Sequence, residues 1–166
     1  MGEITARYYL GFDPGITTGY AVFNEQFQPV DLGQLSFNAL CGVLDSDDPY
    51  FKDPIKLVVE DYMIYPNKAK AHAGSRVQTR DAIGAIRAYA RRKGVQIVFQ
   101  GADKLDIALR YAGVTMPSDH SLTHKWSAYA HLYYYLVTQG LLKTALEIKN
   151  EQAKANSARE STKESS

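Results

Sequence analysis

The sequence predicts one α/β domain, with a mixed five-stranded sheet flanked by α-helices. The order of the expected elements is the first reason: three strands, a helix, a strand, a helix, a strand and then helices, which fits a sheet covered on its faces. The length of 166 residues is the second reason, because it suits a single domain with a buried core. The only cysteine, Cys41, excludes a disulfide framework and a cysteine-based zinc site.

The N-terminal part predicts three strands of an antiparallel meander, at residues 7–12, 20–24 and 29–36. The first of them is rich in aromatic and branched residues, and a turn at 15–19 follows it. Residues 38–54 predict a helix or a loop that ends in a turn-rich run. The apolar run 55–59 then predicts a buried strand.

The middle of the chain predicts a polar, basic and mobile loop at 65–76, followed by a helix at 76–93. The apolar stripe of this helix has helical spacing and consists of Ala82, Ile83, Ile86, Tyr89 and Ala90. Gly94 ends the helix, and residues 95–99 predict the last strand.

Two helices are expected after this strand, at 103–111 and 120–140, the second capped by Ser118 or Asp119. Residues 1–142 therefore form the predicted domain, and 143–166 form a polar tail that is either a frayed helix or disordered.

Several classes of protein are excluded by missing signals. No long apolar run follows Met1 or occurs elsewhere, so we expect a cytoplasmic protein with no membrane partner. The sequence also has neither the GxxxxGK[ST] loop of nucleotide triphosphatases nor the GxSxG turn of serine hydrolases.

The charge is unevenly distributed, although the net charge is only +1. Residues 1–65 contain ten acidic and three basic residues, whereas residues 66–93 contain eight basic residues and one acid. The candidate DNA-binding residues in this basic segment are Lys68, Lys70, Arg76, Arg80, Arg87 and Arg91. The arginines share one helical face, which either follows a phosphate backbone or is simply solvated.

Two acids end apolar strands. Asp13 follows the first strand and precedes Pro-Gly, and Glu60 directly follows Leu57, Val58 and Val59. Strand alternation places Glu60 and Val58 on the same face of the sheet. If the two strands are neighbours, their carboxylates meet and repel each other unless a cation such as Mg²⁺ lies between them.

Four segments, in order, resemble the RuvC family of Holliday-junction resolvases. They are GFDPGITTGYAVF, LVVEDY, RVQTRDAIGAI and HKWSAYAHLYYYL, and the resemblance covers about residues 7–140. It implies an RNase H-like fold and a Mg²⁺-dependent endonuclease, with Mn²⁺ as a possible substitute. The short length and the divergent last segment resemble phage-encoded members, which act in the cytoplasm of a bacterial host.

The resemblance also implies that Asp13 and Glu60 are metal ligands. Family members carry Asp or His at the position of His124 and Asp at the position of Ser127. The resemblance therefore implies that His124 is a metal ligand or an acid near neutral pH, whereas the neutral hydroxyl of Ser127 is a weak Mg²⁺ ligand. Three explanations are open: Asp119 reaches the site, Ser127 acts through water, or a substitution weakens catalysis. His120 is a weaker candidate for the site.

His131 lies on the same helical stripe as His124, and we interpret it as a partly buried helix histidine without a functional role.

The expected activity is hydrolysis of branched DNA by a homodimer, leaving 5′-phosphate and 3′-hydroxyl ends, as the resemblance implies. Four-way junctions are the expected substrate, with flaps and forks as further candidates. The alternatives are a junction-binding module that cuts poorly, because of Ser127, and a nuclease of the same fold that acts on flaps or RNA–DNA hybrids.

Overall fold

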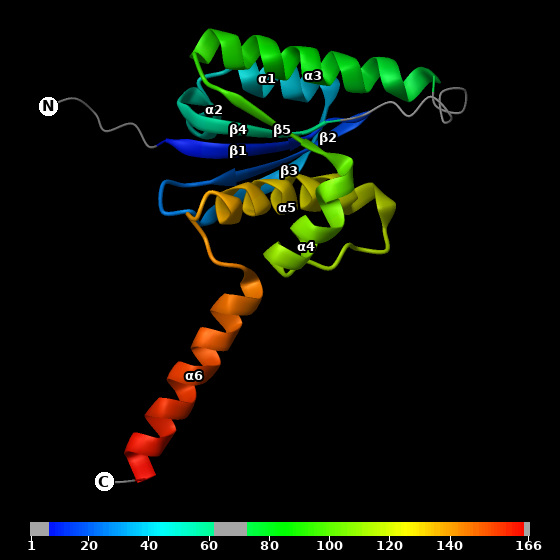
Figure 1. Cartoon of the computed structure of the whole chain (residues 1–166). Coiled ribbons are helices and arrows are strands. Elements are labelled where there is room, and N and C mark those ends of the chain that lie inside the picture. The colour runs from blue at the N-terminus through cyan, green and yellow to red at the C-terminus, as the bar shows by residue number, and fades with distance from the viewer. Residues whose placement is uncertain (1–6, 62–72, 165–166) are drawn as a thin grey trace, which may run out of the picture.

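The computed structural model describes residues 7–61 and 73–164, and its centre is a mixed five-stranded sheet (Figure 1). The strands are β1 (Tyr8–Asp13), β2 (Thr17–Phe23), β3 (Pro29–Ser36), β4 (Pro54–Asp61) and β5 (Ile97–Gly101), and they lie in the order β3-β2-β1-β4-β5. β1, β2 and β3 form an antiparallel meander, while β4 runs parallel to both β1 and β5. The predicted fold class is therefore confirmed.

Helices cover both faces of this sheet. They are α1 (Phe37–Asp45), α2 (Pro49–Lys52), α3 (Ala73–Lys93), α4 (Leu105–Ala112), α5 (Thr123–Thr138) and α6 (Ala145–Glu164), with 3-10 turns η2 (Ala102–Lys104) and η3 (His120–Leu122). α1 and α3 lie over one face, and α4 and α5 lie over the other (Figure 1). The result is a three-layer arrangement with the sheet in the middle.

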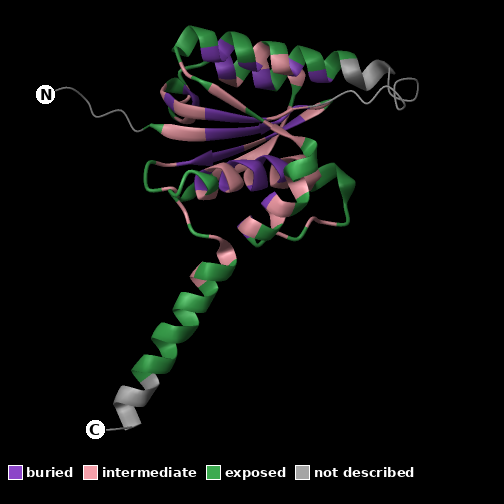
Figure 2. Ribbon diagram, in the orientation of Figure 1, coloured by how far each residue is buried: buried purple, intermediate pink, exposed green. Residues whose placement is uncertain are grey.

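Strand alternation divides the buried residues into two cores. Leu10 and Phe12 of β1 pack in the core beneath α1 and α3, together with Tyr89 of α3. Val58 of β4 packs instead in the core beneath α4 and α5. β1, β2 and β4 are consequently buried on both faces, whereas the edge strands β3 and β5 are only partly covered and the outer face of α3 is exposed (Figure 2).

Two glycines allow α5 to lie very close to the sheet. A Cβ atom on Gly19 of β2 would lie 2.0 Å from the backbone oxygen of His124, and one on Gly11 of β1 would lie 2.6 Å from that of Ala128. Both distances are far inside van der Waals contact, so no other residue fits without moving the helix. This close approach brings the first turns of α5 over the ends of β1 and β4.

The start of α5 is also fixed by hydrogen bonds. The Asp119 carboxylate accepts a hydrogen bond from the Ser121 backbone N–H at 2.9 Å and so caps η3. Gln34 of β3 donates to the Ser121 carbonyl at 2.6 Å and accepts from the Lys125 N–H at 3.3 Å. Asp119 therefore caps the 3-10 turn, whereas the α-helix that was predicted to begin there starts at Thr123 with no side-chain cap. The Lys125 side chain also contacts its neighbour Trp126, with the ammonium group 5.8 Å from the centre of the indole ring.

The segment predicted as a helix or loop at 38–54 contains two short helices and the start of β4. Ser36 caps α1 through its hydroxyl, and Asp48 caps α2 through its carboxylate. The Tyr89 hydroxyl of α3 donates to the Phe51 carbonyl and joins α2 to the core. The loop predicted at 65–76 lies mostly outside the described residues, and α3 already begins at Ala73.

The predicted tail contains the long helix α6, which projects away from the sheet and its covering helices (Figure 1). Its residues 149–159 are all exposed, as is Leu146 nearer the domain (Figure 2). Within the described ranges, no helix combines the length and the apolar character that crossing a membrane requires.

Candidate active site

Asp13 and Glu60 lie at the carboxyl ends of neighbouring parallel strands. β1 pairs with β4 with Phe12 opposite Val59, so the residues that follow each of them are adjacent. Both carboxylates belong to the face covered by α5, because Phe12 and Val59 belong to the opposite core. The sequence-based expectation that the two acids come together is met.

His124, in the first turn of α5, holds Asp13. Its Nδ1 lies 2.8 Å from Oδ2 of Asp13, whose residue surface is only 9 % exposed. Burial raises the pKa of Asp13 to about 6; the hydrogen bond with His124 opposes this rise, and the charge of Glu60 adds to it. The same hydrogen bond raises the pKa of His124, although partial burial opposes the rise. Both pKa values are therefore raised, so that at a given pH each of the two groups is protonated more often than it would be in water.

Glu60 is held by two side chains of α5. The Ser127 hydroxyl donates to Oε2 of Glu60 at 2.7 Å, and Nε2 of His131 lies 3.4 Å from the same oxygen. Burial by itself would raise the pKa of Glu60, but the contacts with His131 and Ser127 outweigh it, so this pKa lies below its usual value. Glu60 is thus the more readily ionised of the two carboxyl groups.

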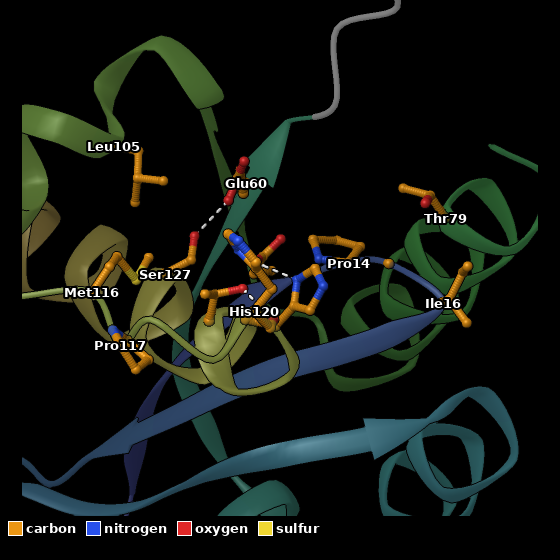
Figure 3. A pocket seen from close by; sticks show the side chains of 13 residues that line it. Pro14, Ile16, Glu60, Thr79, Leu105, Met116, Pro117, His120 and Ser127 are labelled. Carbon is orange, nitrogen blue, oxygen red and sulfur yellow. Dashed lines mark hydrogen bonds and ion pairs between the residues drawn. The ribbon is translucent and has the colours of Figure 1, made fainter. Parts of the chain in front are cut away.

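The two acids line a pocket of about 710 Å³. Figure 3 shows Glu60 with Ser127 pointing toward it, Ile16 and Thr79 on one side, and Leu105, Met116 and Pro117 on the other. Ile16 is 58 % exposed at the rim. The pocket therefore combines an acidic floor with apolar walls.

Asp119 is not brought to this pocket. Its carboxylate is exposed and accepts hydrogen bonds from Ser121, from the backbone N–H at 2.9 Å and from the hydroxyl at 2.7 Å. Its neighbour His120 does line the pocket. Of the three explanations offered for Ser127, the one in which Asp119 replaces the missing ligand is therefore not the arrangement in this structure.

The donor set fits a magnesium ion that is shared with substrate. Across the described residues, no group of three or more His, Cys, Asp and Glu side chains is arranged to hold a metal ion by itself. Mg²⁺, however, is commonly bound by one or two carboxylates together with water and substrate phosphates. Asp13 and Glu60 each have one oxygen engaged by α5, and the charge of Glu60 contributes to the raised pKa of Asp13. A cation between the two carboxyl groups would offset this repulsion.

The basic face of α3 is exposed, and it begins next to the pocket. Arg80, Arg87 and Arg91 are all exposed, and Arg80 directly follows Thr79, which lines the pocket. The Arg87 guanidinium lies 5.0 Å from the centre of the Phe99 ring. Gly84, between the arginines, has open space around it, so close helix packing does not explain this glycine.

Other candidates of the basic segment cannot be placed. Lys68 and Lys70 lie outside the described residues, and the side chain of Arg76 is not described. Arg92, which is in the same helix, pairs with Asp45 at 2.5 Å and is not on the arginine stripe.

Two residues next to Glu60, His131 and Gln100, were not predicted to belong to the site. The sequence predicts a partly buried His131, but this side chain is fully buried and its Nε2 lies 3.4 Å from Oε2 of Glu60. Gln100 of β5 lies opposite Glu60 in the sheet, and its Oε1 is 2.8 Å from Nδ1 of His131. Two features of the sequence could have indicated them: His131 follows Ser127 by four residues, and the polar Gln100 lies near a strand end.

No family model and no curated protein sequence matches this chain. Solved structures do. Thermus thermophilus RuvC in complex with a Holliday junction substrate is 18 % identical with a TM-score of 0.56, and the match covers 83 % of this chain and 99 % of that one. A second T. thermophilus RuvC structure is 17 % identical with a TM-score of 0.51, covering 82 % and 99 %. The fowlpox virus resolvase, in complex with Holliday junction DNA, is 11 % identical with a TM-score of 0.50, covering 78 % and 99 %. The chain therefore has the RuvC-type RNase H-like fold.

Proposed function

We propose that this protein is a structure-selective endonuclease that resolves four-way DNA junctions by Mg²⁺-dependent hydrolysis. The observation that carries the proposal is the pair of buried carboxylates, Asp13 and Glu60, at adjacent strand ends. The support from comparison is that the matched proteins of the same fold are a RuvC and a viral resolvase bound to Holliday junctions. Forks and flaps are further substrates to test.

The residues of the site have distinct duties in this proposal. Asp13 and Glu60 would hold the divalent cation, and bound Mg²⁺, or Mn²⁺ in its place, supplies Lewis acidity for the attacking water and the leaving 3′ oxygen. His124 fixes Asp13 through Nδ1 and lines the pocket. Because its pKa is raised, His124 is also suited to hold or donate a proton near neutral pH.

A homodimer is part of the proposal, because a four-way junction is nearly two-fold symmetric and needs two cuts. Helix α3 is the element that we propose for part of the dimer interface or its edge. The divergent last segment is our reason for proposing a phage-encoded protein that acts in the cytoplasm of its host.

The test is cleavage of a synthetic four-way junction with Mg²⁺ by the wild type and by Asp13→Asn. We expect the variant to lose cleavage and to keep junction binding in the presence of a chelator. Flap and RNA–DNA hybrid competitors, run in parallel, distinguish junction selectivity from a broader nuclease of this fold. Unchanged cleavage by the variant would contradict the proposal.

The second candidate is a junction-binding module that cuts poorly, and Ser127 favours it. A hydroxyl that donates to Glu60 cannot supply the negative charge that a third acid would bring. Ser127→Asp separates the two candidates: a large gain in cleavage at unchanged junction affinity favours the module, and no gain favours an enzyme suited to Ser127.

A further inference from the structure

Behind the pocket lies a buried polar pair that the proposed function does not use. His131 of α5 is fully buried, and its Nδ1 lies 2.8 Å from Oε1 of Gln100 on β5. Its Nε2 has no hydrogen-bond partner among the described residues, yet it lies 3.4 Å from Oε2 of Glu60. Buried polar groups are nearly always satisfied, so a histidine with one unsatisfied nitrogen facing an acid requires a reason.

The sheet register and the helix periodicity bring His131 and Ser127 to the same oxygen atom of Glu60. β4 and β5 pair so that Glu60 lies opposite Gln100, and residues 127 and 131 are neighbours on one face of α5. As a result, the Ser127 hydroxyl and Nε2 of His131 both approach Oε2 of Glu60. Two side chains of α5 therefore bear on the same oxygen of this carboxylate.

The hydrogen positions follow from satisfying every buried atom. A neutral histidine has a single N–H, and if Nδ1 donates it to Gln100, then Nε2 turns a lone pair toward a carboxylate. A half-turn of the Gln100 amide, which exchanges its oxygen and nitrogen, allows the amide to donate to Nδ1. The hydrogen of His131 then lies on Nε2 and faces Glu60.

We propose that His131, oriented by Gln100, is a positioning residue that works with Ser127 to fix the Glu60 carboxylate for a divalent cation. This inference rests on the proposed function for its cation. Its physical reason is specific to this chain: Ser127 contributes no charge, so the site depends on only two carboxylates and on holding them in place. Groups that orient metal ligands in this way commonly change metal affinity by about 10–100-fold when they are removed.

The variants isolate the role of the Nε2 hydrogen. His131→Leu removes both nitrogens, His131→Gln restores an N–H of similar reach, and Gln100→Leu removes the orienting amide. Tyr133→Phe is the matched control, because it removes a hydrogen bond of α5 to the Lys143 carbonyl, at 2.8 Å, away from the site.

The first measurement is Mn²⁺ affinity of the free protein by calorimetry, together with kcat and KM for junction cleavage. We expect His131→Leu to weaken Mn²⁺ binding about 10-fold or more and to lower kcat, with KM and metal-free junction affinity little changed. His131→Gln should recover most of the loss, and Tyr133→Phe should resemble the wild type. In a Glu60→Gln background, His131→Leu should cause no further loss.

Two outcomes would overturn the inference: wild-type Mn²⁺ affinity in His131→Leu, or an equal loss in the Glu60→Gln background. If His131→Leu does not fold, His131→Gln and Gln100→Leu carry the same comparison. The second measurement is the ¹⁵N NMR spectrum of the imidazoles in metal-free protein, where we expect the Nε2–H form of His131, and the Nδ1–H form would overturn the inference. A wild type that neither binds Mn²⁺ nor cuts junctions would refute the proposed function, and the tautomer would still decide the role of His131.

Discussion

Asp13 is a residue whose placement favours function over stability. Its carboxylate is buried beside Glu60, and burial raises its pKa to about 6 from an ordinary value of 3.8. Between these values the folded protein holds a proton that the unfolded chain has released. The stability contribution of Asp13 is therefore fully present below the lower value and is lost as the pH rises through the higher one.

We predict that Asp13→Asn stabilises the metal-free protein at neutral pH. The neutral amide should raise the free energy of unfolding by about 1–3 kcal/mol at about pH 7 and by much less near pH 4. Urea denaturation in a chelator at both pH values measures this. Asp53→Asn is the control, since Asp53 is a half-exposed acid paired with Arg7 at 3.2 Å and its replacement should change stability little. A variant that is less stable than the wild type at neutral pH contradicts the prediction.

The sequence was informative about individual site residues when their role depended on the local chain. Asp13 and Glu60 follow apolar strands, so their position at strand ends could be predicted. The roles of His131 and Gln100 could not, because they depend on β5 pairing beside β4 and on the rotation of α5 about its axis. Neither property is encoded in a short window of sequence.

At the scale of elements, the site is made by the close approach of α5 to the sheet. His124 and Ser127 reach the two acids only because Gly19 and Gly11 leave room for the helix backbone. A Cβ atom at either position would overlap the backbone of α5.

We predict that Gly19→Ala destabilises the fold and disturbs the site together. A Cβ atom there would lie 2.0 Å from the His124 backbone oxygen, so α5 must move, at a cost of about 2 kcal/mol or more. Thermal and urea denaturation, with Mn²⁺ binding, measure both effects.

Gly84→Ala is the matched control for this substitution. Gly84 lies within α3 with open space around it, so alanine should stabilise the protein by about 0.5–1 kcal/mol. Equal effects of the two substitutions would show that the close approach of α5 is not the reason for Gly19.

The arginine stripe of α3 carries a prediction about DNA. Joint replacement of Arg80, Arg87 and Arg91 by alanine should weaken junction binding about 10-fold or more at low salt and reduce its salt dependence. Fluorescence anisotropy over a range of salt concentrations measures both. Arg92→Ala is the control: its guanidinium pairs with Asp45 away from the arginine stripe, so its loss should change DNA affinity and its salt dependence little. Unchanged salt dependence in the triple variant would favour the solvated-face alternative.

The types of most elements could be predicted, but their ends could not. The predicted strand at 95–99 is observed as β5, Ile97–Gly101, and the predicted helix at 120–140 is a 3-10 turn followed by α5. These ends are determined by side-chain caps and by tertiary contacts such as that of Gln34 with the start of α5. Such contacts join residues that are far apart in the chain.

At the scale of the whole molecule, α6 stands apart from the domain. Only its first turns lie near α4, and the helix beyond them is exposed. The exposed pair of Lys143 and Glu151, at 2.6 Å, contributes little stability in water.

We predict that a chain ending at Ile148 keeps the stability of the full-length protein to within about 0.5 kcal/mol. The reason is that the removed residues bury almost no apolar surface. A chain ending at Leu142 is the comparison, because it also removes the Lys143 carbonyl that accepts a hydrogen bond from Tyr133. A large loss of stability in the chain ending at Ile148 would show that α6 packs against the domain in solution.

Trp126 lies where its intrinsic fluorescence can report on the site. It is the single tryptophan of the chain and lies in α5 between His124 and Ser127, with the Lys125 ammonium near its ring. Light at the red edge of protein absorption excites tryptophan and not the twelve tyrosines. The emission of the unlabelled protein therefore comes from the turn of α5 that carries His124 and Ser127, which contact the two acids. A change in emission intensity or wavelength would report cation or DNA binding in real time.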